Sequence, residues 1–305
     1  MLLGIAGQQA AECAETILFV GNSFTYGAES PQVQGFRPET VTDLNREGMG
    51  GVPALFKSFT RQAGLAYDVS LETASGMNLD FHFEQKAALI ARPWDHVVVQ
   101  GYSTLDADAP GDGGKIIDYS ARLARMFHAA NPQVDVRLVA TWSRADQTYL
   151  PSGHWFGKPI EAMAIDIRAA YDRAAERSSY IRAVIPLGEA WNRAIADGLA
   201  ARNPYEAIGT RQINLWAADG YHASRYGYYL AALMIFGSVT GHDPRSLGGA
   251  EQAAAQLGIS PDLALALQCI AFETLEGEWA KARRFHRRSD RQRVTGSRAS
   301  SFLNS

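Results

Sequence analysis

The chain has 305 residues, of which 47% are hydrophobic, so it is long enough to bury one large core. Its 29 basic and 32 acidic residues give a formal net charge of -3, which provides no overall field for nucleic acid or an anionic membrane. No apolar run approaches the roughly 20 residues of a membrane-spanning helix. The two cysteines, Cys13 and Cys269, have no CxxC spacing and no histidine at metal-ligand spacing. We therefore expect a small neutral substrate or partner rather than a polyanion, with no nucleic acid, membrane span, metal or cofactor.

The two ends of the chain differ in composition from its middle. Residues 1–14 are predicted to be a flexible leader or the remnant of a signal peptide, because "LLGIAG" precedes a small polar run but follows no basic segment. Periplasmic or secreted and cytoplasmic locations therefore stay equally open. Residues 281–305 carry eight Lys or Arg before a Ser-rich stretch and are predicted to be a disordered tail. Residues 15–280 between them are predicted to form a single domain.

Short β-rich runs alternate with helical patterns along the chain, which predicts an α/β fold: a five-stranded parallel sheet in a three-layer sandwich. Strands are expected at Thr16–Val20, Tyr67–Thr73, His96–Gln100, Val134–Thr141 and Ala183–Leu187. Three of them, "ILFV", "HVVVQ" and "VRLVAT", are apolar almost throughout, as is typical of strands buried on both faces. Helices are expected at Gly51–Ala63, Ile116–Ala130, Pro159–Arg177, Gly188–Leu199 and Arg225–Val239, the last within the core.

Two irregular segments, Thr104–Gly114 and Ala145–Gly157, follow predicted strands. They would leave the carboxyl ends of those strands, which is where open α/β sheets bind ligands. His154 and Trp155 in the second segment could line a substrate pocket, although packing is the more common use of such aromatics.

The stretch "ILFVGNSFT" places Ser23 directly after the first strand. A serine there could be the N-cap of the next helix, or a nucleophile at the carboxyl edge of the sheet. A nucleophile needs a base with an orienting carboxylate. Asp219 and His222 in "DGYH" have a spacing that lets the carboxylate reach the imidazole, although Asp-Gly is also a common turn dipeptide. His82, His96, His128, His242 and His286 have no such neighbours in the sequence.

"GNSFT" near the start and "DGYH" near the end resemble the first and last blocks of the SGNH (GDSL-like) hydrolases, over about residues 17–241. The resemblance implies a flavodoxin-like fold, with Ser23 as nucleophile, His222 as base and Asp219 as its orienting group. Asn22 replaces the usual aspartate of the family, and we expect it to tie the turn through backbone hydrogen bonds rather than to act chemically.

The resemblance also implies an oxyanion hole. The backbone N–H groups of Ser23 and Gly76 would provide two donors, fixed in direction before charge develops. The family usually adds an Asn side chain after the third strand, where this chain has "QGYS" instead. Ser103 stands at the Asn position but is shorter, whereas Gln100 has the amide chemistry but is offset by three residues. We favour Gln100 over Ser103.

The sequence therefore predicts an SGNH-type serine esterase that hydrolyses a small acyl ester, with an acetyl group on a carbohydrate as the first expectation. An acyltransferase with the same three residues and a non-catalytic ligand-binding module are the alternatives. The oligomeric state is left open.

Overall fold

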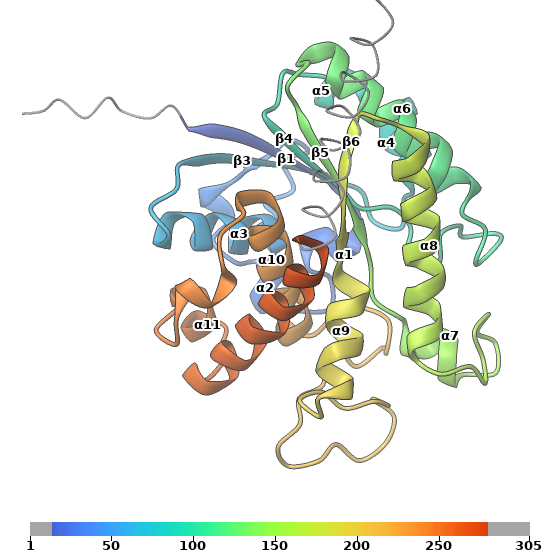
Figure 1. The fold of residues 1–305 in the computed structure, drawn as a ribbon, viewed down its shortest axis with the longest axis vertical. Helices are drawn as coiled ribbons and strands as arrows, with labels where there is room; N and C mark the ends of the chain where they lie inside the picture. Colours follow the sequence, from blue (N-terminus) through green and yellow to red (C-terminus); the bar gives the residue numbers. More distant parts are fainter. Residues whose placement is uncertain (1–13, 280–305) are drawn as a thin grey trace, which may run out of the picture.

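The computed structural model describes residues 14–279 and has one parallel sheet flanked by helices, as predicted (Figure 1). The predicted leader, apart from Ala14, and the predicted tail lie outside the described residues. The strands are β1 Glu15–Gly21, β2 Thr42–Asp43, β3 Tyr67–Thr73, β4 His96–Val99, β5 Asp135–Ala140 and β6 Ile181–Pro186. All five predicted strands are present, but the expected strand count was one too low. The added strand, β2, has only two residues and pairs with β3 at one edge of the sheet.

The strand order is β2-β3-β1-β4-β5-β6, with parallel pairing throughout. From β1 the chain moves to β3 on one side and then crosses to β4 on the other side. The carboxyl end of β1 is therefore the point where the winding direction reverses. Open α/β sheets bind ligands at such a point, and here it is the position of the "GNSFT" segment.

The five predicted helices are confirmed, with ends shifted by a few residues. The helices are α1 Ser23–Tyr26, α2 Pro31–Gln34, α3 Gly51–Gln62, α4 Leu79–Gln85, α5 Ala87–Ile90, α6 Gly114–Ala130, α7 Ala145–Tyr149, α8 Glu161–Arg177, α9 Leu187–Ala196, α10 Arg225–Thr240 and α11 Gln252–Gln256, with residues 261–279 forming another. Two 3-10 helices span Pro38–Thr40 and Pro244–Leu247. The segment expected to be irregular over 145–157 contains the short helix α7.

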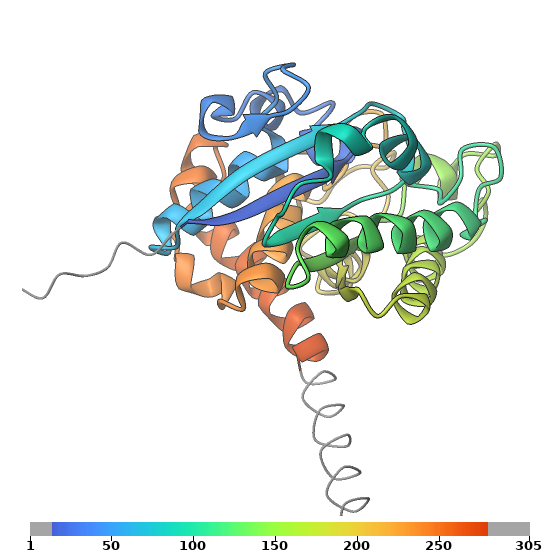
Figure 2. The same ribbon diagram turned by 90° about the horizontal axis from the view of Figure 1, so that it is seen from above.

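Two hydrophobic clusters cover the two faces of the sheet. Helices α3, α9 and α10 and the helix at 261–279 contribute to one cluster, and α4, α5, α6 and α8 to the other (Figures 1 and 2). Helix α10 is buried continuously from Gly227 to Val239, which confirms its predicted place in the core. Its ends are set by Ser224, whose hydroxyl accepts from the N–H of Tyr226, and by Gly241, which adopts the left-handed conformation.

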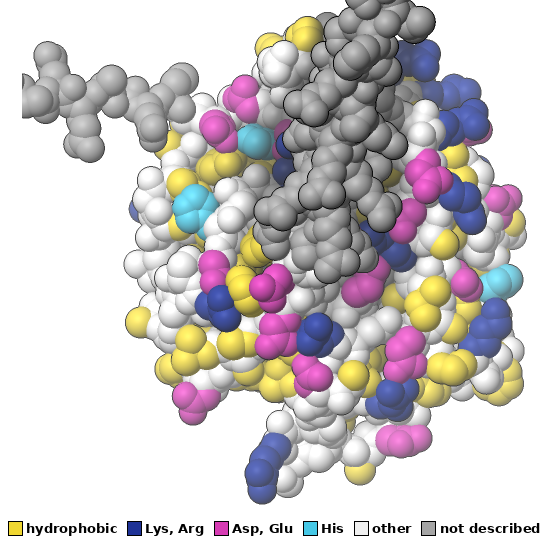
Figure 3. Space-filling view, viewed as in Figure 1, with side chains coloured by type: hydrophobic (Ala, Val, Ile, Leu, Met, Phe, Trp, Pro, Cys, Tyr) yellow, Lys and Arg dark blue, Asp and Glu magenta, His cyan; other side chains and the backbone are white. Residues whose placement is uncertain are grey.

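The surface agrees with the nearly neutral composition. Acidic and basic side chains lie interspersed over most of the face seen in Figure 3. Within residues 14–279, no helix combines the length and apolar character needed to cross a membrane.

Candidate active site

The turn after β1 is built by Asn22. Its side-chain oxygen accepts from the N–H of Phe24 at 3.1 Å and so caps α1. Ser23 is the first residue inside the helix, and its backbone N–H has no acceptor within that helix. The alternative explanation of Ser23 as the helix cap is therefore wrong, because its neighbour has that role. Ser23 is left with both its hydroxyl and its N–H available for other contacts.

Asn22 also joins three loops at the carboxyl edge of the sheet. Its Nδ2 donates to the carbonyl of Met77, after β3, at 3.0 Å and to the carbonyl of Gly101, after β4, at 3.2 Å. The expected role of Asn22 in backbone hydrogen bonding is confirmed. Both contacts are made by the amide nitrogen, which an aspartate at this position would lack.

The aromatic ring next to the serine anchors the turn in the core. Phe24 stacks on Trp142 with centroids 4.1 Å apart, and Trp142 stacks on Trp191 of α9 at 4.7 Å. Both ring pairs are nearly parallel. The turn that carries Ser23 is therefore supported from below by a fully packed aromatic stack.

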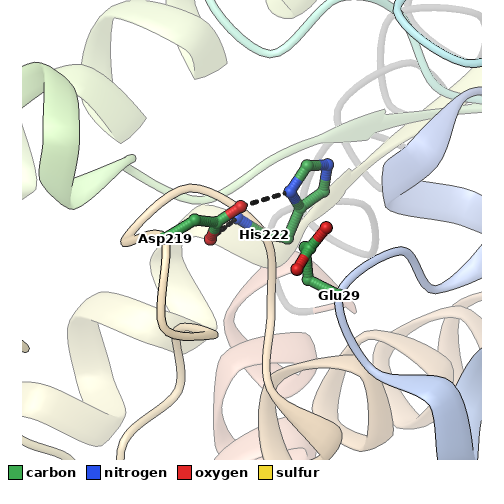
Figure 4. Close-up of side chains that lie close together, drawn as sticks. All are labelled: Glu29, Asp219 and His222. Carbon is green, nitrogen blue, oxygen red and sulfur yellow. Dashed lines mark hydrogen bonds and ion pairs between the residues drawn. The ribbon is translucent and has the colours of Figure 1, made fainter.

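Asp219 and His222 occupy a turn just before α10. The Asp219 carboxylate lies 2.6 Å from Nδ1 of His222, and its other oxygen accepts from the N–H groups of Tyr221 and His222 at 2.9 Å (Figure 4). Burial acts to raise the pKa of Asp219, but the hydrogen bonds from the imidazole and the two N–H groups outweigh it and leave the pKa below its ordinary value. The carboxylate is thus held ionised against the imidazole.

The structure brings the ring of His222 to the turn that carries Ser23. The imidazole meets the ring of Phe24 edge-on with centroids 5.6 Å apart. Its Nε2 atom is buried and makes no hydrogen bond, so it is not bonded to the Ser23 hydroxyl in this conformation. Catalytic hydrogen bonds are often long before substrate binds.

A second carboxylate, not predicted from the sequence, also faces this pair. Ligand atoms of Glu29, Asp219 and His222 all lie within 4.8 Å of one another (Figure 4). Glu29 is exposed and adopts a left-handed backbone with φ 60°. Of the residues described, these three are a set that could hold a metal ion, but Nδ1 of His222 is already paired with Asp219.

Gly76 lies in the turn between β3 and α4, next to Met77, whose carbonyl is bound by Asn22. Its φ of 69° is a left-handed conformation that suits glycine.

A fully buried pair joins α4 to β3: Nδ1 of His82 on α4 is 2.5 Å from the Glu72 carboxylate on β3. Sequence reasoning found no partner for His82, because a strand residue ten positions away is brought to it only by the fold.

The two candidates for the third oxyanion donor lie in different places. Gln100 is buried under the turn that carries Ser23, where its oxygen accepts from the backbone N–H of Asn22 at 3.2 Å and from the Thr25 hydroxyl at 3.0 Å. Its amide nitrogen donates to the carbonyl of Gly101. Ser103, also buried, accepts from Nη1 of Arg144 at 3.2 Å. The contacts of Gln100 are those of a residue that supports the turn.

Arg144 and Tyr221 were not singled out from the sequence. The Arg144 guanidinium lies 3.5 Å from the centroid of the Tyr221 ring, and the same ring packs against His222 at 4.0 Å. Tyr221 stands within "DGYH", so its position beside His222 could have been inferred from the motif. Arg144 carries no such signal in the sequence.

The two aromatic candidates after β5 separate in the structure. Trp155 is fully buried in a core cluster and donates its Nε1 hydrogen to Asp166 at 2.7 Å, so it is a packing residue. His154 is exposed and meets the Trp155 ring edge-on.

Comparison with known proteins supports the architecture. No family model and no curated protein matches the sequence. A solved DUF4886 family protein from Bacteroides uniformis superposes with a TM-score of 0.54 at 18% sequence identity, covering 86% of this chain and 95% of that one.

A second solved structure, a protein described as a GDSL-like lipase from Parabacteroides merdae, superposes with a TM-score of 0.51 at 17% identity. That match covers 74% of this chain and 95% of the other. At such identities the likeness concerns the fold alone. Together with the strand order and the turn after β1, it identifies the architecture of this chain as the SGNH, or GDSL-like, hydrolase fold.

Proposed function

We propose that this chain is a serine esterase of SGNH type. The observation that carries the proposal is the 2.6 Å contact between Asp219 and Nδ1 of His222, in a turn packed against the helix that begins at Ser23. The carboxylate fixes the tautomer with the proton on Nδ1, so the free Nε2 is the basic nitrogen. A base, its orienting group and a serine at a helix N-terminus thus share one edge of the sheet.

The reaction would proceed in two steps without a cofactor. The Ser23 hydroxyl rotates toward Nε2 of His222, gives up its proton and attacks the acyl carbonyl. His222 then returns that proton to the leaving alcohol as the C–O bond breaks. Water, activated in the same way, releases the acyl group and regenerates Ser23. Asp219 and the nearby Glu29 are the negative charges that face the imidazolium formed in each step.

The free N–H of Ser23 at the start of α1 supports the role of this N–H group in the oxyanion hole. We assign the backbone N–H of Gly76 as the second donor.

The substrate we propose is a small acyl ester, with an acetyl group on a carbohydrate as the first choice. The loop after β4 is acidic and rich in Gly and Pro, which does not suit the shelter of a long apolar chain.

The proposal is tested by labelling with a fluorophosphonate, read by intact mass, together with hydrolysis of p-nitrophenyl acetate. We expect one adduct on Ser23, and loss of label and turnover in Ser23→Ala and His222→Ala. Ser152→Ala is the matched control, because Ser152 lies exposed in the turn after α7. A wild-type protein that takes no label and turns over no ester would overturn the proposal.

The same assay separates the two other functions that the sequence left open. Ester product that forms only when an acceptor alcohol is added would indicate acyl transfer. Saturable ligand binding without turnover would indicate a binding module.

A further inference from the structure

The aromatic ring of Tyr221 is enclosed by the candidate active site. The guanidinium of Arg144 covers the ring at 3.5 Å from its centroid, while His222 and Phe24 pack against it at 4.0 Å and 5.4 Å. The Tyr221 ring therefore packs against both His222 and the residue that follows Ser23.

Arg144 is buried, and its charge is already compensated. Its Nε and Nη2 atoms donate to the two carboxylate oxygens of Asp146 at 2.9 Å and 2.6 Å. Such a bidentate pair leaves no free cation for an anionic substrate. The third hydrogen bond of the guanidinium is the Nη1 donation to the Ser103 hydroxyl at 3.2 Å. Arg144 therefore acts within the protein, by linking the loops after β4 and β5.

The Ser103 hydroxyl can accept one hydrogen bond and donate another. Its oxygen accepts from Arg144, so its own hydrogen is free to be donated. The Tyr221 hydroxyl lies near the hydroxyls of both Ser103 and Ser23, which act on it as hydrogen-bonding neighbours. The three groups can form a directed relay: Arg144 donates to Ser103, Ser103 can donate to Tyr221, and the Tyr221 hydrogen is then left to be donated beside Ser23.

The surroundings also keep the phenol in its donor form. Burial raises the pKa of Tyr221, and this outweighs the opposing influence of the Arg144 charge and of the neighbouring Ser103 and Ser23 hydroxyls. A cation over the ring face draws electron density from the ring, which makes the hydroxyl a stronger donor. The Tyr221 hydroxyl is thus a protonated, fixed and polarised donor.

We propose that the Tyr221 hydroxyl is the third donor of the oxyanion hole, and that Ser103 and Arg144 are positioning residues that orient it. This inference rests on the proposed esterase function. It explains how a site with a serine in place of the usual asparagine can still have three donors: the phenol extends from the motif of the base to a point that the short Ser103 side chain does not reach.

The test measures kcat and KM for p-nitrophenyl acetate and the rate of fluorophosphonate labelling in wild type, Tyr221→Phe, Ser103→Ala and the double variant. Loss of one oxyanion donor typically lowers kcat by about 100-fold or more. We expect a loss of that order in Tyr221→Phe, with a similar loss in labelling rate and little change in KM, because the hydrogen bond forms only in the transition state. Thermal melting verifies that each variant is folded.

Ser103→Ala removes a single hydrogen bond from the relay, so we expect a kcat loss on the order of tenfold. If Ser103 acts through Tyr221, the double variant should be no slower than Tyr221→Phe alone. The matched control is Tyr119→Phe on α6, where the hydroxyl donates to Glu84 and Arg122 covers the ring. Its kcat should equal that of the wild type.

The outcomes distinguish this inference from the proposed function. If the wild type labels at Ser23 but Tyr221→Phe keeps its kcat and labelling rate, the inference is wrong and the esterase proposal stands. If the kcat loss of the double variant equals the product of the two single-variant losses, Ser103 acts independently of Tyr221. A wild type that neither labels nor turns over ester would overturn both. Should Tyr221→Phe fail to fold, Ser103→Ala still decides, because an unchanged kcat there contradicts the relay.

Discussion

The Asp219 carboxylate contacts His222 twice, at the imidazole Nδ1 with 2.6 Å and at the backbone N–H with 2.9 Å. One side chain therefore both shapes the turn and orients the His222 imidazole. These two roles can be separated by mutation, because an amide oxygen can still accept from the backbone but carries no charge.

Asp219→Asn should consequently fold and lose activity. We expect kcat to fall by about 1,000-fold or more, because the imidazolium loses its charge partner and the Nδ1 tautomer is no longer favoured. Hydrolysis of p-nitrophenyl acetate measures the loss. Asp197→Asn, at an exposed position just after α9, is the control and should keep its kcat. An unchanged kcat in Asp219→Asn would contradict the assignment of the base.

The same residue predicts a pH dependence of stability. The pKa of Asp219 is lower in the folded protein than its ordinary value of about 3.9, so the carboxylate stabilises the fold above that pH. This contribution disappears as the pH falls through the folded-state pKa. The difference in unfolding free energy between wild type and Asp219→Asn, from urea titrations, should shrink as the pH falls below about 4. A difference that grows as the pH is lowered from about 4 to 3 would contradict the prediction.

Asn22→Asp should destabilise the protein, even though an aspartate is the usual residue at this position in SGNH hydrolases. The new carboxylate would face the carbonyl oxygens of Met77 and Gly101, which now accept from the amide nitrogen. Loss of buried hydrogen-bond partners costs about 1–3 kcal/mol. Urea unfolding measures the cost. Asn214→Asp is the control, because Asn214 acts through its oxygen, which accepts from the N–H of Trp216. Equal stabilities in the two variants would argue against the three-loop junction.

A pair of glycine variants tests how tightly α3 supports the turn that carries Ser23. Gly51 and Gly64 both have positive φ, at 61° and 73°. A Cβ on Gly64 would meet open space, whereas one on Gly51 would lie 2.7 Å from the carbonyl oxygen of Thr25 in α1. Gly64→Ala should cost about 1–2 kcal/mol of backbone strain and leave kcat unchanged. Gly51→Ala should cost more and lower kcat as well, since α1 must move. Comparable kcat values in both would show that the position of α1 does not depend on this contact.

The centre of the sheet was predictable because β1, β4 and β5 are largely buried and contain nearly continuous apolar runs. Strand β2 was not, since Thr42–Asp43 is too short to show any periodicity. The same holds for the one-turn helix α1: with four residues, it is determined by the Asn22 cap and not by a helical repeat.

Within the site, sequence reasoning succeeded where partners are close in the chain. Asp219 and His222 are three residues apart, and a local turn suffices to join them. Ser103 and Arg144 are 41 residues apart and meet only because β4 and β5 are neighbours in the sheet. The choice between Gln100 and Ser103 could not be argued from spacing either, because it depends on which side of the turn each side chain faces.

The stack of Phe24, Trp142 and Trp191 has an optical consequence. Two nearly parallel indoles 4.7 Å apart couple their near-ultraviolet transitions. Phe24, the residue that follows Ser23, stacks directly on one of them, Trp142. A shift of α1 on the proposed acylation of Ser23 would alter the ring spacing and therefore the near-ultraviolet circular dichroism. The protein thus contains an intrinsic spectroscopic reporter of movements of the turn that carries Ser23, readable without any attached dye.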